Sequence, residues 1–332
     1  MHHAAPLGMG RMPADHLTTT PPYHLAAAVL AILAGADLDA TGATSGVDPD
    51  DLDDALQVYR AAGLAALERR AERGWYQLRV QFPDWSAAET IGATHLGPRL
   101  DELQAGGATT GWWFLRKYPC WRLRLRDADS AAVDQMLDEL LMAGLLTRWW
   151  PTVYEPEIAA FGGPTGMDVV HDLFGADSRG VLDYARQSAP SLGRRELSVL
   201  LINALCREAG LDWFELGDVF DRVARLRPAP DADDVRVEQL ADSLRTLLAL
   251  PAPAANALFE VGGPVAFAAP WLAAHQIAGR RLGEAASQGR LHRGVRAALT
   301  HVVVFHWNRL DLPATTQGIL AHAARTATLP RS

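Results

Sequence analysis

The arginines best suited to hold an anion lie in one short run, Trp121 to Arg126, which reads WRLRLR. Alternation along a strand would place Arg122, Arg124 and Arg126 on one face, about 7 Å apart, and the apolar residues on the other. A guanidinium is always charged and offers a planar fork of donors, so this row suits a carboxylate, a phosphate or an anionic intermediate. The alternative is a solvated or salt-bridged outer face, because the chain also carries 39 acidic residues.

A second group of polar residues and glycines begins at the end of a stretch predicted as a strand. Tyr154 and Glu157 belong to an extended segment, which runs into a turn at Gly162 and Gly163 before another helix. Glycines in such a turn let backbone amides point at a ligand ahead of a helix N-terminus. A plain connector is the competing interpretation.

The third group lies in the run FHWNRLDLP, at the end of a segment predicted as a strand over residues 301–307. His306 offers a group that titrates near neutrality, Asn308 an amide and Arg309 a fixed cation. Together they could move a proton beside an anion. The alternative for a histidine at a strand end is a packing role.

No metal and no cofactor are expected. Cys120 and Cys206 are too few for a disulfide framework and are not spaced as zinc ligands, so both are expected to be buried thiols. The sequence contains no GxxxxGKS/T phosphate loop, no GxGxxG after a strand, no HExxH and no GxSxG. Nucleotide hydrolysis, hydride transfer and serine hydrolysis therefore lose support.

Charge and hydropathy limit the partners. A net charge of −8 argues against a general nucleic-acid binder, because such proteins need an excess of Lys and Arg to displace counterions. No uninterrupted apolar run reaches the length of about 18 residues that a membrane helix needs, and the start lacks a signal-peptide pattern. A cytoplasmic protein of two compact units, without a membrane segment, is expected from the 332 residues.

The elements that would position these residues begin after a polar lead, residues 1–22, which is expected to be disordered. Residues 23–73 carry helical spacing, with acidic residues in the first turn of the second helix. This small helical module would fit a helix-turn-helix shape, but its acidic face argues against DNA recognition.

Residues 74–330 are predicted to form the main domain, which is α+β. Its first half has the order strand, helix, strand, strand, helix, strand, which indicates a ferredoxin-like, or split βαβ, antiparallel sheet. The predicted strands cover 75–82, 111–117, 121–126 and 146–154, the middle two forming a hairpin, and the helices cover 87–105 and 130–144. Beyond residue 167 a large helical part follows, in which Asp177 and Ser178 are expected to cap a helix. Its predicted helices cover 167–174, 179–187, 194–209, 213–225 and 314–326.

Several separated blocks, taken together, resemble the C-terminal domain of class I lanthipeptide dehydratases. The blocks are WYQLRVQF, GWWFLRKYPCWRLRLR, VYEPEIAAFGGPTGMDVVHDLFGADS and FHWNRLDLP, and the resemblance covers about Trp75 to Thr326. The sequences of these blocks are more similar still to the stand-alone branch called thiopeptide-type bacteriocin biosynthesis proteins, which is related to thiopeptide pyridine synthases.

The resemblance implies chemistry on a ribosomally made precursor peptide with a leader. The lanthipeptide branch removes glutamate from glutamylated Ser or Thr, which leaves dehydroalanine or dehydrobutyrine. The thiopeptide branch joins two dehydroalanines in a formal 4+2 cycloaddition and expels the leader. Elimination would require a glutamyl-tRNA-dependent dehydratase partner. Cycloaddition and a non-catalytic, precursor-binding subunit stay open as alternatives, and so does a homodimer.

The resemblance also implies roles for single residues. Arg116 matches a family arginine implicated in elimination, and His306 matches a histidine that can serve as acid or base. Arg309, Arg122 and Arg124 would complete the anion-binding surface. Substrate contacts are expected at Tyr154, Glu157, Gly162, Gly163 and Asn308.

The sequence departs from the family pattern at Ala160. Dehydratase elimination domains usually carry an arginine just before the aromatic-Gly-Gly motif, whereas here Ala160 precedes Phe161. The change could mark a different reaction, such as cycloaddition, or a cation supplied from elsewhere. The helical module over 23–73 lies outside the shared core and could dock a leader peptide or a partner dehydratase, or cover a sheet face.

Overall fold

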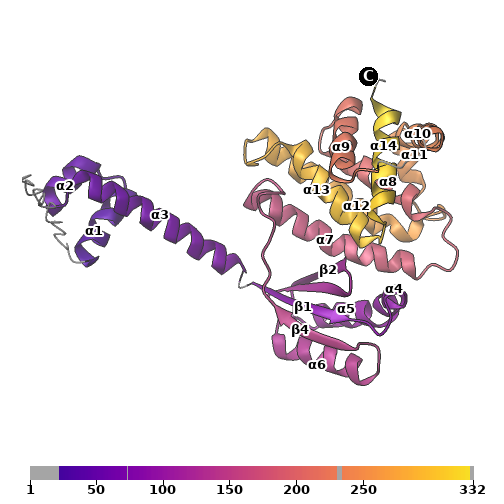
Figure 1. Ribbon diagram of the computed structural model, residues 1–332, viewed down its shortest axis with the longest axis horizontal. Helices are drawn as coiled ribbons and strands as arrows, with labels where there is room; N and C mark the ends of the chain where they lie inside the picture. Colours follow the sequence, from indigo (N-terminus) through magenta and orange to yellow (C-terminus); the bar gives the residue numbers. More distant parts are fainter. Residues whose placement is uncertain (1–21, 73, 230–233, 330–332) are drawn as a thin grey trace, which may run out of the picture. The chain divides into compact units, whose positions relative to one another are not determined.

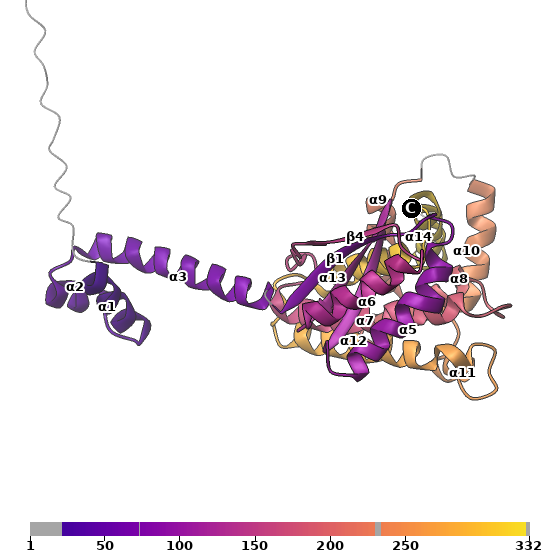
Figure 2. The ribbon, with the colours of Figure 1, turned by 90° about the horizontal axis from the view of Figure 1, so that it is seen from below.

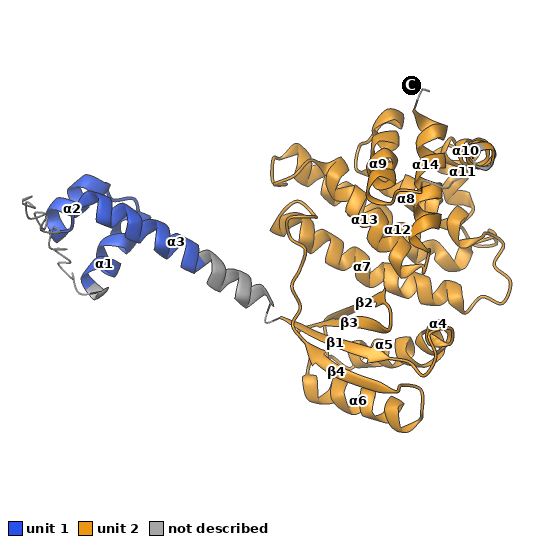
Figure 3. Cartoon of the chain, in the orientation of Figure 1, with its two compact units in different colours: residues 1–71 blue, residues 72–332 orange. Residues whose placement is uncertain are grey.

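The computed structural model describes residues 22–72, 74–229 and 234–329. The chain divides into two compact units, residues 1–71 and 72–332 (Figure 3). The predicted disordered lead falls outside the described residues, except for Pro22, which begins a helix. In the described ranges, no helix combines the length and the apolar character that crossing a bilayer requires.

The described part of the N-terminal unit consists of three helices, α1 (Pro22–Leu33), α2 (Leu38–Ser45) and α3 (Pro49–Glu72). The sequence predicted α1 and α3, with acidic residues in the first turn of α3, and the structure adds the short α2. A few apolar side chains form the core of this unit. They are Ala28, Val29, Val47, Leu52 and Leu56.

The C-terminal unit begins with a four-stranded antiparallel sheet in the order β2-β3-β1-β4 (Figure 1). The strands are β1 (Trp75–Gln81), β2 (Gly111–Lys117), β3 (Cys120–Arg126) and β4 (Arg148–Thr152). The connecting helices are α4 (Ala88–Ile91), the π-helical turn η1 (Gly92–Leu96), α5 (Gly97–Ala105) and α6 (Ser130–Met142). The predicted ferredoxin-like order and the β2–β3 hairpin are confirmed.

One face of the sheet packs against α5 and α6. Alternation directs Leu78 and Leu123 to this face, and both are fully buried. Trp112 and Trp149 lie on the same face, and each indole nitrogen donates a hydrogen bond of 2.9 Å to an aspartate, on α5 and α6 respectively. Figure 1 shows α6 on the side of the sheet away from α7, and in the view from below the two helices overlap (Figure 2).

The remainder of the unit is helical. Its elements are α7 (Pro164–Ala185), α8 (Arg194–Glu208), α9 (Trp213–Leu226), α10 (Asp234–Leu248), α11 (Ala252–Ala257), the 3-10 turn η2 (Ala266–Ala268), α12 (Ala269–Ser287), α13 (Val295–Arg309) and α14 (Ala314–Thr328). Helix α12 packs on α7 and α8, and α14 packs on α9 and α10. The apolar core is continuous from the sheet into these helices.

The predicted strand over residues 301–307 is wrong, because this segment belongs to α13. Val302, Val303 and Trp307 are all buried, since α13 packs against α7, α8, α9 and β2. A helix enclosed on several sides is apolar around most of its surface and loses its 3.6-residue pattern. Its β-branched residues then resemble a buried strand.

The predicted helix boundary at Asp177 and Ser178 is also wrong, because α7 runs unbroken through both residues. The two side chains are buried and bind other elements instead of capping a helix. Ser178 Oγ accepts a hydrogen bond of 3.1 Å from the backbone nitrogen of Phe114, and the carbonyl oxygen of Phe114 accepts one of 3.1 Å from Arg309 Nε. Helices α7 and α13 thereby close the outer edge of β2, which would otherwise expose unpaired backbone groups.

Candidate functional site

The predicted arginine row lies on the sheet face opposite to α5 and α6. On this surface, cross-strand pairing aligns residues from all four strands in rows. One row is Leu115, Arg122, Arg79 and Trp150, and the next is Trp113, Arg124, Gln77 and Thr152. We call this surface the arginine face and define it by Arg79, Arg122, Arg124, Arg126 and Arg148.

Arg124 is the most deeply buried member of the arginine face, with 1% of its surface exposed. Its guanidinium lies 4.2 Å from the ring centroid of Trp113 and 4.3 Å from that of Tyr154. Nε donates to Gln77 Oε1 at 2.7 Å, whereas the buried Nη1 has no hydrogen-bond partner. Burial lowers the pKa of Arg124 to about 10, so the side chain stays cationic at neutral pH.

Tyr154 and Glu157 border Arg124 from the segment that follows β4. The Tyr154 hydroxyl lies 2.8 Å from His171 Nε2. Burial raises the pKa of Tyr154 and lowers the pKa of His171 to about 3, so the hydroxyl donates to a neutral imidazole. Glu157 Oε2 is buried without a hydrogen-bond partner, and its negative charge acts on Arg124 and on Tyr154. Arg124 and Glu157 thus each keep an unused polar atom, although they lie within range of each other's charge.

Arg293 approaches Ala160, the position at which the resemblance led us to expect an arginine. Its Nη1 lies 3.4 Å from the carbonyl oxygen of Ala160 and 3.2 Å from His301 Nε2. Arg293 is exposed, and no carboxylate of the described ranges forms an ion pair with it. A cation from the segment before α13 therefore borders the loop that leads to Gly162.

Gly162 and Gly163 form a tight turn before α7, with φ angles of +87° and +92° that favour glycine. The Gly163 amide donates to Ile158 O, and Gly162 O accepts from His292 N, both at 2.9 Å. A Cβ on Gly163 would lie 2.7 Å from the His292 ring. The turn is packed and the Gly163 amide is in use, so ligand binding by this turn stays a prediction.

Arg116 lies on the other face of the sheet. It pairs with Trp121 across the hairpin, and its guanidinium lies 5.0 Å from the Trp121 ring. It forms an ion pair with Glu89 and lies 3.6 Å from Asp311, while Arg194 also binds Glu89. Burial lowers the pKa of Arg116, and the Glu89 carboxylate opposes that shift. The structure therefore does not bring Arg116 together with the arginine face.

His306 and Arg309 lie in the interior, where both bind Asp177. His306 Nδ1 is 2.7 Å from Asp177 Oδ1, Arg309 forms an ion pair with Asp177 Oδ2, and Trp271 Nε1 donates to Oδ1 at 2.7 Å. Burial lowers the pKa of His306 to about 3. Because Arg309 already balances the charge of Asp177, neutral His306 donates from Nδ1 and leaves the buried Nε2 without a partner.

Sequence reasoning missed Asp177 as an organising residue. A signal for it existed, because Asp177 falls on the helical stripe of α7 that also carries Val170, Phe174 and Val181, all buried. An acid on an apolar stripe needs buried partners. Asn308, which was predicted as a substrate contact, accepts a hydrogen bond of 2.9 Å from Gln317 Nε2 and so links α13 to α14.

One group in the described part of the chain brings metal-ligand atoms together. Asp177, His275 and His306 place them within 4.8 Å of one another, and all three residues are buried. The Asp177 carboxylate already accepts three donors, and His275 Nδ1 is bonded to Trp271 O at 2.9 Å. A metal ion would also meet the Arg309 guanidinium. The arrangement therefore fits a buried hydrogen-bond network better than a metal centre.

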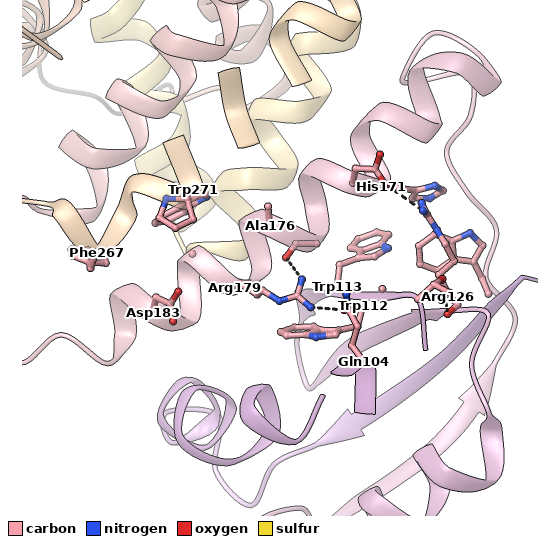
Figure 4. Close-up of a pocket in the computed structure, with 17 residues that line it drawn as sticks. Gln104, Trp112, Trp113, Arg126, His171, Ala176, Arg179, Asp183, Phe267 and Trp271 are labelled. Atoms are coloured by element: carbon pink, nitrogen blue, oxygen red, sulfur yellow. Dashed lines mark hydrogen bonds and ion pairs between the residues drawn. The ribbon is translucent and has the colours of Figure 1, made fainter. Parts of the chain in front are cut away.

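A cavity of about 370 Å³ opens at one end of the arginine face (Figure 4). Trp75, Trp113 and Arg126 line it from the sheet, and Trp271 lines it from α12. Arg179 of α7 crosses it and donates to the Gln104 side chain at 2.6 Å, as Figure 4 shows. The cavity lies beside Trp113, and so it adjoins the Arg124 environment.

The fold resembles solved structures at low identity. The tRNA-dependent lantibiotic dehydratase MibB from Microbispora sp. 107891 matches with a TM-score of 0.57 and 17% identity over 75% of this chain, which spans 28% of MibB. TsrL matches with a TM-score of 0.50 and 17% identity, over 78% of this chain and 99% of TsrL. The pyridine synthase TbtD from thiomuracin biosynthesis has a TM-score of 0.49 and 15% identity, over 76% and 97% of the two chains. No curated protein matches the sequence.

The family model described as "Lantibiotic biosynthesis dehydratase C-term" matches residues 75–328. The match begins at the first residue of β1 and ends at the last residue of α14. It includes every residue of the arginine face and of the Asp177 network. The chain therefore belongs to the family of lantibiotic biosynthesis dehydratase C-terminal domains, as the resemblance of its motifs predicted.

Proposed function

We propose that the protein removes glutamate from glutamylated Ser or Thr residues of a ribosomally made precursor peptide. Membership in the dehydratase C-terminal family supports work on such peptides. The observation that supports the elimination step is the arrangement of Arg124 and Glu157. Arg124 is a buried cation whose Nη1 has no hydrogen-bond partner, and Glu157 has a buried Oε2 that also lacks one. The negative charge of Glu157 acts on Arg124. A substrate that contacts these two atoms would satisfy both.

Glu157 acts as the base in this proposal. Its Oε2 takes the α-proton of the glutamylated residue, because this carboxylate oxygen has no donor to satisfy it. The electrons of the broken C–H bond form the Cα=Cβ double bond, and the Cβ–O bond breaks. The ester oxygen leaves with glutamate as its carboxylate, and the proton stays on Glu157. The products are a dehydroamino acid and glutamate, and no redox partner is needed.

Arg124 and Arg122 stabilise the negative charge that develops during this reaction. The guanidinium of Arg124 lies between aromatic rings, away from bulk water, where a charge interaction is stronger than in solvent. Arg122 is only partly buried, so it can meet the departing carboxylate. A single preorganised donor of this kind contributes about 100-fold to 1,000-fold in rate.

Arg116, His306 and Arg309 enter the proposal as positioning residues. Each is buried in ion pairs or hydrogen bonds that join the sheet to the helices. Arg309 also lies 5.7 Å from the ring of Trp113, which is the ring that packs on Arg124. The glutamyl ester itself would come from a separate glutamyl-tRNA-dependent partner, because elimination consumes an ester that another reaction must supply.

A formal 4+2 cycloaddition of two dehydroalanines is the second candidate, and Ala160 favours it. The family arginine that would assist elimination is replaced there by a side chain without charge. Arg293 supports elimination instead, because its guanidinium lies close to the carbonyl oxygen of Ala160 and so supplies a cation to this loop.

Mass spectrometry of two substrates tests the proposal. The purified protein is incubated with a glutamylated Ser peptide and, separately, with a leader-bearing peptide that contains two dehydroalanines. Elimination predicts the loss of one glutamate from each modified residue of the first peptide, and unchanged esters would refute it. Leader release and a six-membered nitrogen ring from the second peptide would support cycloaddition. Binding of both peptides without any reaction would favour a non-catalytic precursor-binding subunit.

A further inference from the structure

Three arginines of the arginine face lie on three neighbouring strands, beyond the pair formed by Arg124 and Glu157. Arg122 of β3 and Arg79 of β1 are direct cross-strand partners. Arg148 of β4 pairs with Gln81, two residues along β1 from Arg79, and therefore points to the same side of the sheet. The charges of both Arg79 and Arg148 act on the thiol of Cys120, which lies on the same face at the start of β3.

None of these three arginines has a carboxylate partner in the described ranges. Other arginines on or beside the sheet do: Arg116 pairs with Glu89, Arg126 with Asp172 and Arg179 with Asp101. Like charges directly opposite each other across two strands destabilise a sheet. Three unpaired guanidiniums on adjacent strands therefore cost stability, and an external anion would relieve that cost.

The surroundings of these arginines fit a peptide side chain. Trp150 and Leu115 stand at the two ends of the row that contains Arg79 and Arg122. The Arg148 guanidinium lies 4.6 Å from the Trp150 ring, which holds its planar fork in place. Arg79 Nε is buried without a hydrogen-bond partner. The site thus offers charged donors at its centre and apolar contact at its margins.

We infer that Arg79 and Arg148, together with Arg122 at the border with the elimination site, form a second anion subsite, which binds the carboxylate of an acidic residue in the peptide substrate. The inference rests on the proposed function in one respect only, namely that the ligand is a substrate peptide. A nucleic acid is the poorer candidate, because the chain has a net charge of −8 and the subsite has three cations, too few for a phosphate backbone. A peptide carboxylate needs only one planar fork of donors.

Fluorescence anisotropy tests the subsite on the full chain without any reaction. The probes are a labelled Ala/Gly/Ser peptide that carries two Glu residues and its copy with Gln in place of Glu. We expect the Glu peptide to bind about tenfold more tightly than the Gln peptide, which corresponds to about 1.4 kcal/mol. Arg79→Gln and Arg148→Gln should each remove most of this preference. Arg195→Gln, at an exposed arginine of α8, should keep it.

The inference would be overturned by equal binding of the two peptides to the wild-type protein, or by an unchanged preference in Arg148→Gln, an exposed position where substitution leaves the core intact. Stronger competition by single-stranded RNA than by the Glu peptide would assign the surface to nucleic acid instead. The elimination assay separates this inference from the proposed function. Unchanged glutamyl esters together with a Glu preference would refute elimination and leave the subsite in place.

Discussion

The carboxylate of Asp177 lies 2.7 Å from His306 Nδ1, and this contact joins the middle of α7 to the end of α13 in the interior of the protein. The same carboxylate holds the guanidinium of Arg309, whose Nε binds the backbone of β2. One acid therefore anchors two helices and, through Arg309, the edge of the sheet that carries Arg124.

Replacing Asp177 should weaken the whole C-terminal unit. Asp177→Asn leaves the buried Arg309 without its negative partner, so we expect the free energy of unfolding to fall by about 3–5 kcal/mol. Urea titration followed by circular dichroism measures it. The matched control is Asp172→Asn on the same helix, whose ion pairs with Arg126 and Arg281 are partly exposed and should contribute at most about 1 kcal/mol. Equal losses in the two variants would contradict this account.

Stability should fall in mild acid because three buried histidines stay neutral. Burial lowers the pKa values of His171, His275 and His306 from 6.5 to about 3. Below pH 6.5 the unfolded chain binds protons that the folded chain does not, so stability is lost as the pH falls from 6.5 toward 3. Each histidine contributes up to about 1.4 kcal/mol per pH unit.

Thermal unfolding across this range measures the effect. His275→Gln removes one of the three groups, so the free energy of unfolding should fall less steeply with decreasing pH than in the wild type. The absolute stability of the variant does not matter for this comparison, because only the slope is read. An unchanged slope would mean that His275 is not held neutral in the folded state.

The sheet was predictable because its signals are local. Period-two alternation placed Arg122 and Arg124 on one face, and the order of elements gave the ferredoxin-like arrangement, both confirmed. The face of the sheet on which Arg116 lies could not be predicted in the same way. It depends on the register of the hairpin, and a shift by one residue would have moved Arg116 to the arginine face.

The interior network escaped prediction for a related reason. His306 and Asp177 are separated by 129 positions in the sequence, and only the packing of α13 on α7 brings them together. The pattern of α13 resembled a strand because buried residues occur on several of its sides, and the pattern of α7 resembled two helices because a tertiary partner satisfies Ser178.

Glu157→Gln should stop or strongly slow elimination without unfolding the protein. The amide cannot accept the α-proton, and a general base typically contributes about 100-fold to 10,000-fold in rate. Single-turnover release of glutamate measures the effect. Glu155→Gln, an exposed carboxylate two residues earlier, is the matched control and should keep the wild-type rate. A Glu157→Gln rate within a few-fold of wild type would remove Glu157 as the base.

Arg293 should support the reaction in place of the family arginine. Arg293→Ala removes the cation beside the Ala160 carbonyl group, and we expect about a tenfold or larger loss in glutamate release, as for one charged donor. Ala160→Arg in the Arg293→Ala background places a cation on the same loop and should recover part of the rate. Full activity of Arg293→Ala would show that elimination does not use this cation.

Gly166 should not tolerate a side chain. A Cβ at this position would lie 1.8 Å from the carbonyl oxygen of Phe161, so Gly166→Ala must displace the turn before α7. We expect a loss of about 1–3 kcal/mol, typical of an overpacked site, and a lower melting temperature. Gly111→Ala, where nothing lies within 4 Å of the new Cβ, is the control. Equal melting temperatures for the two variants would argue against this packing.

The hydrogen bonds of Ser178 and Arg309 to Phe114 also determine how copies of this protein can associate. With both backbone groups of Phe114 occupied, β2 cannot accept a strand from another molecule at this point, which leaves β4 as the other outer strand. Pro151 in β4 has no N–H to donate, so β4 is a poor template as well. A sheet continued from one molecule into the next, the arrangement on which amyloid-like fibres depend, is therefore disfavoured at both outer strands.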